Sequence, residues 1–230
     1  MGPAQGDETR EMPRGVPPVY AKYALLLPLI LANLVVFGFE DHHPAVKSIS
    51  HWFAAGTLVL ALYASRVGRG YFIAMVSLAL IATAAWSPAQ AYHRLPGILV
   101  VSIATLIALA PIAIFRRVWS EFVKGGVDTE VVLGVLCAYL YIGSWYAFLY
   151  RAAAFLSNRP FFAQPGADEG MNYVYFSFIT LATVGYGDLS PAYGPGRMLA
   201  ATEGIIGQLY LVSVVALVVS AFGKGKAPPS

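Results

Sequence analysis

Long apolar runs alternate with short polar segments along most of this chain of 230 residues. Six runs are long enough, or nearly so, to cross a hydrocarbon core of about 30 Å as α-helices. They cover residues 20–39, 51–65, 71–86, 95–115, 129–155 and 198–222. A seventh apolar stretch, residues 173–182, is too short to cross. The pattern predicts an all-α membrane protein with six transmembrane helices and one shorter helix that enters the membrane without spanning it.

Composition supports lipid, rather than water, as the main surroundings of the chain. Only 12% of the residues are charged and 58% are hydrophobic, whereas a soluble domain carries about 25% charged residues. The formal net charge of +3 is too small to indicate nucleic-acid binding. The single cysteine, Cys137, lies inside an apolar run, cannot form an intrachain disulfide, and is interpreted as a small buried hydrophobic residue.

The distribution of Lys and Arg predicts how the chain sits in the membrane. The richer side holds Arg10, Arg14, Lys22, Arg66, Arg69, Arg116, Arg117, Lys124, Lys224 and Lys226. The other side holds Lys47, Arg94, Arg151, Arg159 and Arg197. Because basic residues accumulate on the cytoplasmic side, both termini are expected inside the cell. The segment between the last two spans then opens to the outside.

The same pattern divides the chain into modules. We expect a disordered cytoplasmic tail (1–19), a four-helix transmembrane module (20–115), an interfacial linker helix (116–128), a pore domain (129–222) and a second cytoplasmic tail (223–230). The linker is predicted because basic residues alternate there with Val118 and Trp119, as in an amphipathic interfacial helix. Asp128 is the expected N-cap of the next helix.

The segment most informative about function is Thr183-Val184-Gly185-Tyr186-Gly187-Asp188. Backbone carbonyls can replace the water shell of a dehydrated K⁺ ion if they all point toward one axis. An ordinary strand alternates its carbonyls, so this arrangement needs residues with positive φ, which glycine adopts without a Cβ penalty. Gly185 and Gly187 stand at alternate positions, and the hydroxyl of Thr183 can add further oxygens at the inner end.

The short apolar stretch before this motif is predicted to be a helix that begins at an Asn172 N-cap and ends near Ala182. Its C-terminal carbonyls carry partial negative charge and would face a cation in the middle of the membrane. Non-helical backbone at that depth is tolerated only where it lines a pore or is buried in protein.

With this motif, residues 131–222 resemble the tetrameric potassium channels, which implies a fourfold homotetramer conducting K⁺ passively and no enzymatic activity or cofactor. By the resemblance, K⁺ binds at Thr183, Val184, Gly185, Tyr186 and Gly187, with Asp188 at the outer mouth. Gly196-Arg197 opens the inner helix, as in many members. Gly207 matches a common hinge position in that family. Steps of four residues from Gly207 mark one face of the helix, and by the resemblance the residues on this face line the cavity and the inner gate. Those positions are Leu211, Val215 and Val219.

The chain also departs from that family. Residues 95–115 carry no Arg or Lys at every third position, so no strong voltage sensor is expected. Ala182 replaces a threonine found in many members, and Tyr175 and Phe176 replace a tryptophan pair. Tyr175 is expected either to hydrogen-bond Asp188 behind the filter or simply to pack there.

Glu203 is a carboxylic acid inside the last predicted span. An intramembrane acid is costly and therefore a functional candidate. It can hold the pore helix through a hydrogen bond, remain protonated, or coordinate ions directly if it faces the axis, and the structural role is favoured.

Two other functions remain as alternatives: a subunit of a potassium transporter, and a non-conducting regulatory channel subunit. The short chain and the few residues after the last span favour a prokaryotic plasma membrane, with K⁺ and lipid as the partners and no nucleic acid.

Overall fold

The computed structural model describes residues 21–39, 44–65, 68–70, 72–73, 76–77, 108–120 and 129–216, and helices dominate these residues. The named elements are α1 (Ala21–Phe37), α2 (Pro44–Ala64), α5 (Thr129–Ser157), α6 (Gly170–Leu181), α7 (Gly194–Tyr210) and the π-helical turn η2 (Leu211–Val215). Residues 108–120 form a further helix. Within the described part there is one isolated β-bridge, between Phe162 and Pro191, and no named strand. The all-helical fold class expected from the sequence is confirmed.

Several helix boundaries differ from the predicted ones. Helix α2 begins at Pro44 rather than at residue 51, and α7 begins at Gly194 rather than at residue 198. Pro195 lies in the first turn of α7, where its missing N–H costs nothing. The helix 108–120 continues without a break past the expected module boundary at residue 116, so the linker is not a separate helix at its start.

Other predictions fall on residues outside the described part. These are both tails, the N-cap Asp128 with the rest of the linker from residue 121, most of the span 71–86, and the first part of the span 95–115. In the described residues, one helix, Val131–Ser157 within α5, is long and apolar enough to cross a membrane. Lys22–Phe37 and Trp52–Ala64 are apolar but shorter. The six spans therefore remain a prediction.

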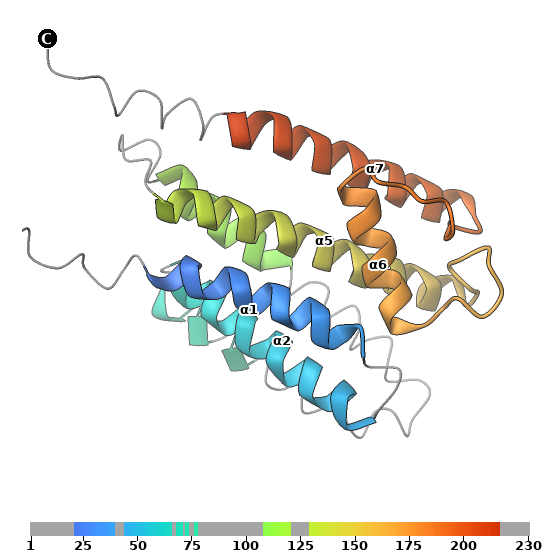
Figure 1. The fold of residues 1–230 in the computed structure, drawn as a ribbon, viewed down its shortest axis with the longest axis horizontal. Helices are drawn as coiled ribbons and strands as arrows, with labels where there is room; N and C mark the ends of the chain where they lie inside the picture. Colours follow the sequence, from blue (N-terminus) through green and yellow to red (C-terminus); the bar gives the residue numbers. More distant parts are fainter. Residues whose placement is uncertain are drawn as a thin grey trace, which may run out of the picture.

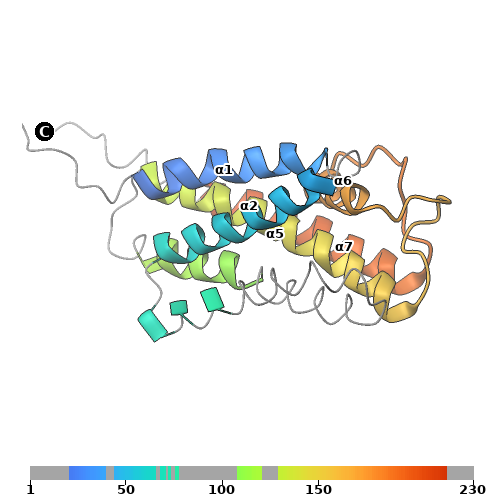
Figure 2. The same cartoon turned by 90° about the horizontal axis from the view of Figure 1, so that it is seen from below.

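Helix α5 is the element around which the described helices are arranged (Figure 1). It contacts α1 on one side and both α6 and α7 on the other, while α2 packs against α1. The second view shows α1 and α2 lying along one another (Figure 2). The short α6 also contacts α7. This places α6, and the chain segment after it, beside both long helices of the predicted pore domain.

Two clusters of buried side chains hold this arrangement together. One lies between α1, α2, the helix 108–120 and the first half of α5, and it includes Leu26, Leu62, Ile114 and Val135. The second is rich in aromatic residues and joins the later part of α5 to α6 and its flanking loops. Its buried members are Tyr146, Ala147, Tyr150, Phe161, Phe162, Ala167, Tyr173 and Phe176.

Candidate pore and selectivity filter

The segment Thr183–Asp188 leaves the C-terminal end of α6 directly. The amide of Ala182, the C-cap, donates to the Phe178 carbonyl at 3.0 Å. The amide of Thr183 donates to the Thr180 carbonyl at 3.0 Å, and that of Val184 to the Ile179 carbonyl at 2.8 Å. The last turn of α6 therefore fixes where the segment begins. We call residues Thr183–Gly187 the ribbon.

Positive φ values occur at every second residue of the ribbon. They are 56° at Thr183, 55° at Gly185 and 80° at Gly187. The positive φ predicted for the two glycines is confirmed, whereas that of Thr183 was not foreseen. A left-handed non-glycine residue costs about 1–2 kcal/mol. The alternation is the backbone pattern that successive carbonyls need in order to face one side.

The ribbon is uncovered in the single chain. Val184 is 50% exposed and Tyr186 is 72% exposed, although both are large apolar or aromatic residues. A Cβ atom added at Gly185 or Gly187 would meet no atom within 4 Å. The described residues of the same chain therefore leave these side chains and both glycines largely uncovered.

A hydrogen bond behind the ribbon links it to α6. The hydroxyl of Tyr175 donates to a carboxylate oxygen of Asp188 at 2.8 Å, so this predicted contact is confirmed. The same bond raises the pKa of the Tyr175 hydroxyl above its usual value, because the phenol proton is held by the carboxylate. The bond therefore ties Asp188, the residue directly after the ribbon, to α6.

The loops on either side of α6 are joined to each other. The amide of Ala163 donates to the Ser190 carbonyl and that of Ala192 to the Phe161 carbonyl, both at 2.8 Å. Asp168 accepts from the Phe161 amide at 2.8 Å and from the Tyr173 hydroxyl at 2.6 Å. The sequence did not lead us to predict that Asp168 and Phe161 join these loops. The adjacent Phe161-Phe162 pair in an otherwise polar loop was the available signal.

Asn172 is not the N-cap of α6, which corrects the sequence-based prediction. The helix begins at Gly170, its N-cap is Glu169, and that residue makes no side-chain capping bond. Asn172 lies in the first turn, where its side-chain amide donates to the Ala167 carbonyl at 2.9 Å. It therefore connects the helix backward to the preceding loop, which an N-cap preference alone could not reveal.

Glu203 on α7 is completely buried between the three helices. Its carboxyl group forms hydrogen bonds with the hydroxyls of Tyr150 on α5 and Ser177 on α6. The predicted hydrogen bond to the short helix is thus confirmed, while its two partners were not identified from the sequence. Glu203 points into the protein and away from the exposed side of α7, so direct ion coordination is not supported by this geometry.

Gly207 is a site of close approach between α7 and α6. A Cβ atom there would lie 2.4 Å from the Leu181 carbonyl oxygen, so only glycine fits. The same carbonyl accepts a hydrogen bond of 3.0 Å from the Tyr139 hydroxyl on α5. The helix is regular at this position, and the irregular π-helical turn begins later, at Leu211.

The predicted common face of the inner helix stays a prediction. Gly207 is buried against α6, whereas Leu211 is 38% exposed. The step from Gly207 to Leu211 is an ordinary helical one, since the Leu211 amide donates to the Gly207 carbonyl, and the π-helical turn Leu211–Val215 alters the four-residue spacing only beyond Leu211. The side chain of Val215 and the whole of Val219 lie outside the described residues. Their cavity-lining role stays a prediction.

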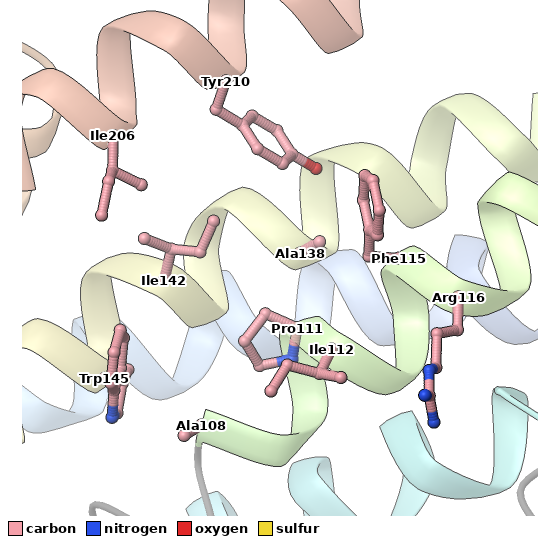
Figure 3. A pocket seen from close by; sticks show the side chains of 10 residues that line it. All are labelled: Ala108, Pro111, Ile112, Phe115, Arg116, Ala138, Ile142, Trp145, Ile206 and Tyr210. Carbon is pink, nitrogen blue, oxygen red and sulfur yellow. The ribbon is translucent and has the colours of Figure 1, made fainter.

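The described residues also form an apolar pocket of about 540 Å³. Figure 3 shows the side chains that line it. It is formed where the helix 108–120 faces α5 and α7, and none of the predicted ion-binding residues lines it. Its lining residues are Ala108, Pro111, Ile112, Phe115, Arg116, Ala138, Ile142, Trp145, Ile206 and Tyr210. The pocket has the chemistry of a hydrocarbon site and not that of an ion path.

Comparison with known proteins agrees with this geometry. Residues 134–224 match the ion channel family. A protein of Rhodopseudomonas palustris, provisionally named a potassium channel protein, is 39% identical over 51 residues. That match covers 22% of this chain and 12% of the relative. Residues 134–224 are thus an ion channel domain. The ribbon Thr183–Gly187 lies within the matched residues, and this part of the chain is similar to the ion channel family and to that relative.

Proposed function

We propose that this protein conducts K⁺ passively and selectively across the plasma membrane as a homotetramer. Four copies of the ribbon Thr183–Gly187 would form the selectivity filter around one central axis. The observation that carries this proposal is the positive φ at Thr183, Gly185 and Gly187, since this alternation permits carbonyls to face the axis at successive levels. The sequence of the ribbon supports it independently.

The mechanism follows from replacing water by protein oxygens. Rings of main-chain carbonyls, with the Thr183 hydroxyls at the inner end, take the place of the hydration shell of K⁺. Neighbouring ions repel each other, which lets each ion leave a site that binds it well. The C-terminal end of α6 carries partial negative charge and would stabilise a cation entering the filter from the cavity.

An assembly of several chains is supported by what a single chain leaves uncovered. Exposed apolar residues recur at helical spacing along α7 and the π-helical turn η2 that follows it. They are Met198, Ile205, Leu209 and Val212. One ribbon provides only one wall of an ion cage, and potassium filters are rings of four such segments. We therefore propose that this exposed face packs against neighbouring subunits.

The remaining parts of the proposal concern topology and gating. Six membrane-spanning helices with both termini in the cytoplasm follow from the apolar runs and the Lys and Arg distribution. Weak dependence on voltage follows from the absence of regularly spaced basic residues in residues 95–115. K⁺ is the transported ion, and no reaction is catalysed.

Flux into liposomes that contain the purified protein tests the proposal. K⁺ and Tl⁺ should enter, Na⁺ should not, and Ba²⁺ should block entry. A tetramer that passes neither K⁺ nor Tl⁺ would instead support the non-conducting regulatory subunit. Equal entry of Na⁺ and K⁺ would refute selectivity while leaving a channel.

A further inference from the structure

We propose that Glu203 is a neutral carboxylic acid that connects α5, α6 and α7 through a directed chain of hydrogen bonds and thereby positions the filter. The proposal deepens the proposed function, because it concerns the support of the same ribbon. Glu203 is a positioning residue here, since its carboxyl group points into the protein, and it acts through α6.

The hydrogen-bond partners of Ser177 are the starting point. Its hydroxyl oxygen lies 2.6 Å from the Gly143 carbonyl oxygen on α5 and also forms a hydrogen bond with the Oε1 atom of Glu203 on α7. A serine hydroxyl has a single proton to donate, although its oxygen can also accept. A carbonyl oxygen can only accept. At hydrogen-bond distance, the Ser177 proton must therefore point to Gly143.

The contact between Ser177 and Glu203 then needs a proton from the other side. If Glu203 were ionised, two oxygen atoms without a hydrogen between them would face each other at this contact. A protonated carboxyl group resolves the conflict by donating from Oε1 to the Ser177 oxygen. Its second oxygen, Oε2, accepts from the Tyr150 hydroxyl. The protons of Tyr150, Glu203 and Ser177 then each form one hydrogen bond, and no two acceptor oxygens face each other without a proton.

Burial favours the same state. The side chain of Glu203 is completely buried, and both groups bonded to its carboxyl are hydroxyls, not cations. The neighbouring Tyr146 hydroxyl is directed to Thr202 at 3.3 Å, and that of Tyr139 to the Leu181 carbonyl. An ionised acid without a charged partner in such a place is strongly disfavoured. A neutral acid needs only its hydrogen bonds.

The resulting chain runs from Tyr150 to Glu203, then to Ser177, and ends at Gly143. It begins and ends on α5 and passes through α7 and α6. Ser177 lies about one turn before the end of α6, from which the ribbon starts. A shift of α7 at Glu203 would therefore move α6, and with it the position of Thr183.

Infrared spectroscopy of the purified protein measures the protonation state directly. The wild type should show a carbonyl-stretch band of a protonated carboxyl group that shifts on ¹³C labelling of glutamate and is missing in Glu203→Gln. If that substitution removes carboxylate bands instead, the proposal is overturned. The measurement does not need conduction, so its outcome is separate from that of the flux test.

Flux measurements on substituted proteins test the positioning role. Glutamine can donate an amide N–H to Ser177 and accept from Tyr150, so Glu203→Gln should conduct K⁺ selectively like the wild type. Glu203→Leu has a similar volume but cannot bond either group, and it should lose selective flux or tetramer assembly. Ser177→Ala should weaken selectivity while keeping the Glu203 carboxyl band. Wild-type behaviour of both Glu203→Leu and Ser177→Ala would contradict a positioning role.

Discussion

The region around the ribbon and the α1–α2 pair are both helical, yet different contacts hold them. Between α5, α6 and α7, side-chain hydrogen bonds repeatedly join one helix to another, including Tyr139 to the Leu181 carbonyl and Tyr210 to the Val135 carbonyl at 2.7 Å. In the α1–α2 pair, Leu26, Ala61 and Leu62 are buried apolar residues, and the Tyr23–Ser65 hydrogen bond between them is longer, at 3.4 Å.

The difference matches what each region has to do. Apolar packing is non-directional and tolerates exchanges between residues of similar volume. Hydrogen bonds restrict both distance and angle. The proposed filter would need its oxygen atoms at fixed positions, and directed bonds between α5, α6 and α7 can provide that. Substitutions at the ribbon and its supports should therefore affect conduction more than comparable changes in the peripheral helices.

The largest effect is expected for Gly185→Ala. Gly185 has a φ of 55°, where a residue with a Cβ atom costs about 1–2 kcal/mol in every subunit. Relaxation of this strain would turn carbonyls away from the axis, so K⁺ flux into liposomes should fall below detection. Gly166→Ala is the matched control, because Gly166 has a φ of 76° but lies in the loop before α6. It should conduct normally, and equal loss in both variants would contradict a specific role of the ribbon.

A large effect is also expected for Gly207→Ala. The added methyl group would lie 2.4 Å from the Leu181 carbonyl oxygen, so α7 must move away from α6. Overpacking of this kind costs about 1–3 kcal/mol. Thermal stability of the tetramer and K⁺ flux should both fall.

The neighbouring Gly204 provides a control for the inner helix. A Cβ atom there would lie 3.9 Å from the nearest atom, the Thr180 carbonyl oxygen, which is ordinary van der Waals contact. Gly204→Ala should therefore be tolerated, or slightly stabilising through helix propensity. If Gly204→Ala were the more damaging variant, the close approach at Gly207 would not be what limits the packing of α6 and α7.

A moderate effect is expected for Tyr175→Phe. The change removes the 2.8 Å hydrogen bond to Asp188 and little else, and the effect is moderate because this bond is exposed to solvent. Selectivity for K⁺ over Na⁺ should remain, while the lifetime of the conducting state in single-channel recordings should change. Asp188→Asn combined with Tyr175→Phe completes a double-mutant cycle. Strictly additive effects of the two changes would mean that this bond does not support the ribbon.

The sequence predicted the parts of this structure that depend on short-range chemistry. The helix α5, the short α6, the positive φ of both ribbon glycines and the Tyr175–Asp188 bond follow from apolar length, glycine and side-chain pairing. The start of α6 was misplaced because the N-cap preference of asparagine does not distinguish a cap from a first-turn position, and in the first turn Asn172 donates to the Ala167 carbonyl instead.

Other features depend on contacts between distant parts of the chain. The partners of Glu203 lie 53 and 26 residues away, at Tyr150 and Ser177, and helical periodicity cannot pair them. The role of Gly207 as a contact with Leu181 depends on how two helices cross. The π-helical turn after Tyr210 breaks the four-residue spacing that sequence analysis extends through the inner helix.

The smallest effect is expected for a charge change in the peripheral helix, Arg116→Gln. Arg116 lies on the helix 108–120, at the pocket between that helix and the pore region. Moving one elementary charge across the membrane potential changes the free energy by about 2.3 kcal/mol per 100 mV. Steep voltage dependence therefore requires several such charges in each subunit. Arg116 and Arg117 are adjacent and lie at one end of the apolar run, so we expect them to be anchors rather than moving charges. Open probability in planar bilayers should depend weakly on voltage in the wild type, and Arg116→Gln should leave that dependence almost unchanged. A steep voltage dependence that flattens in this variant would show that the peripheral helices drive the pore, and would remove the contrast between the two regions.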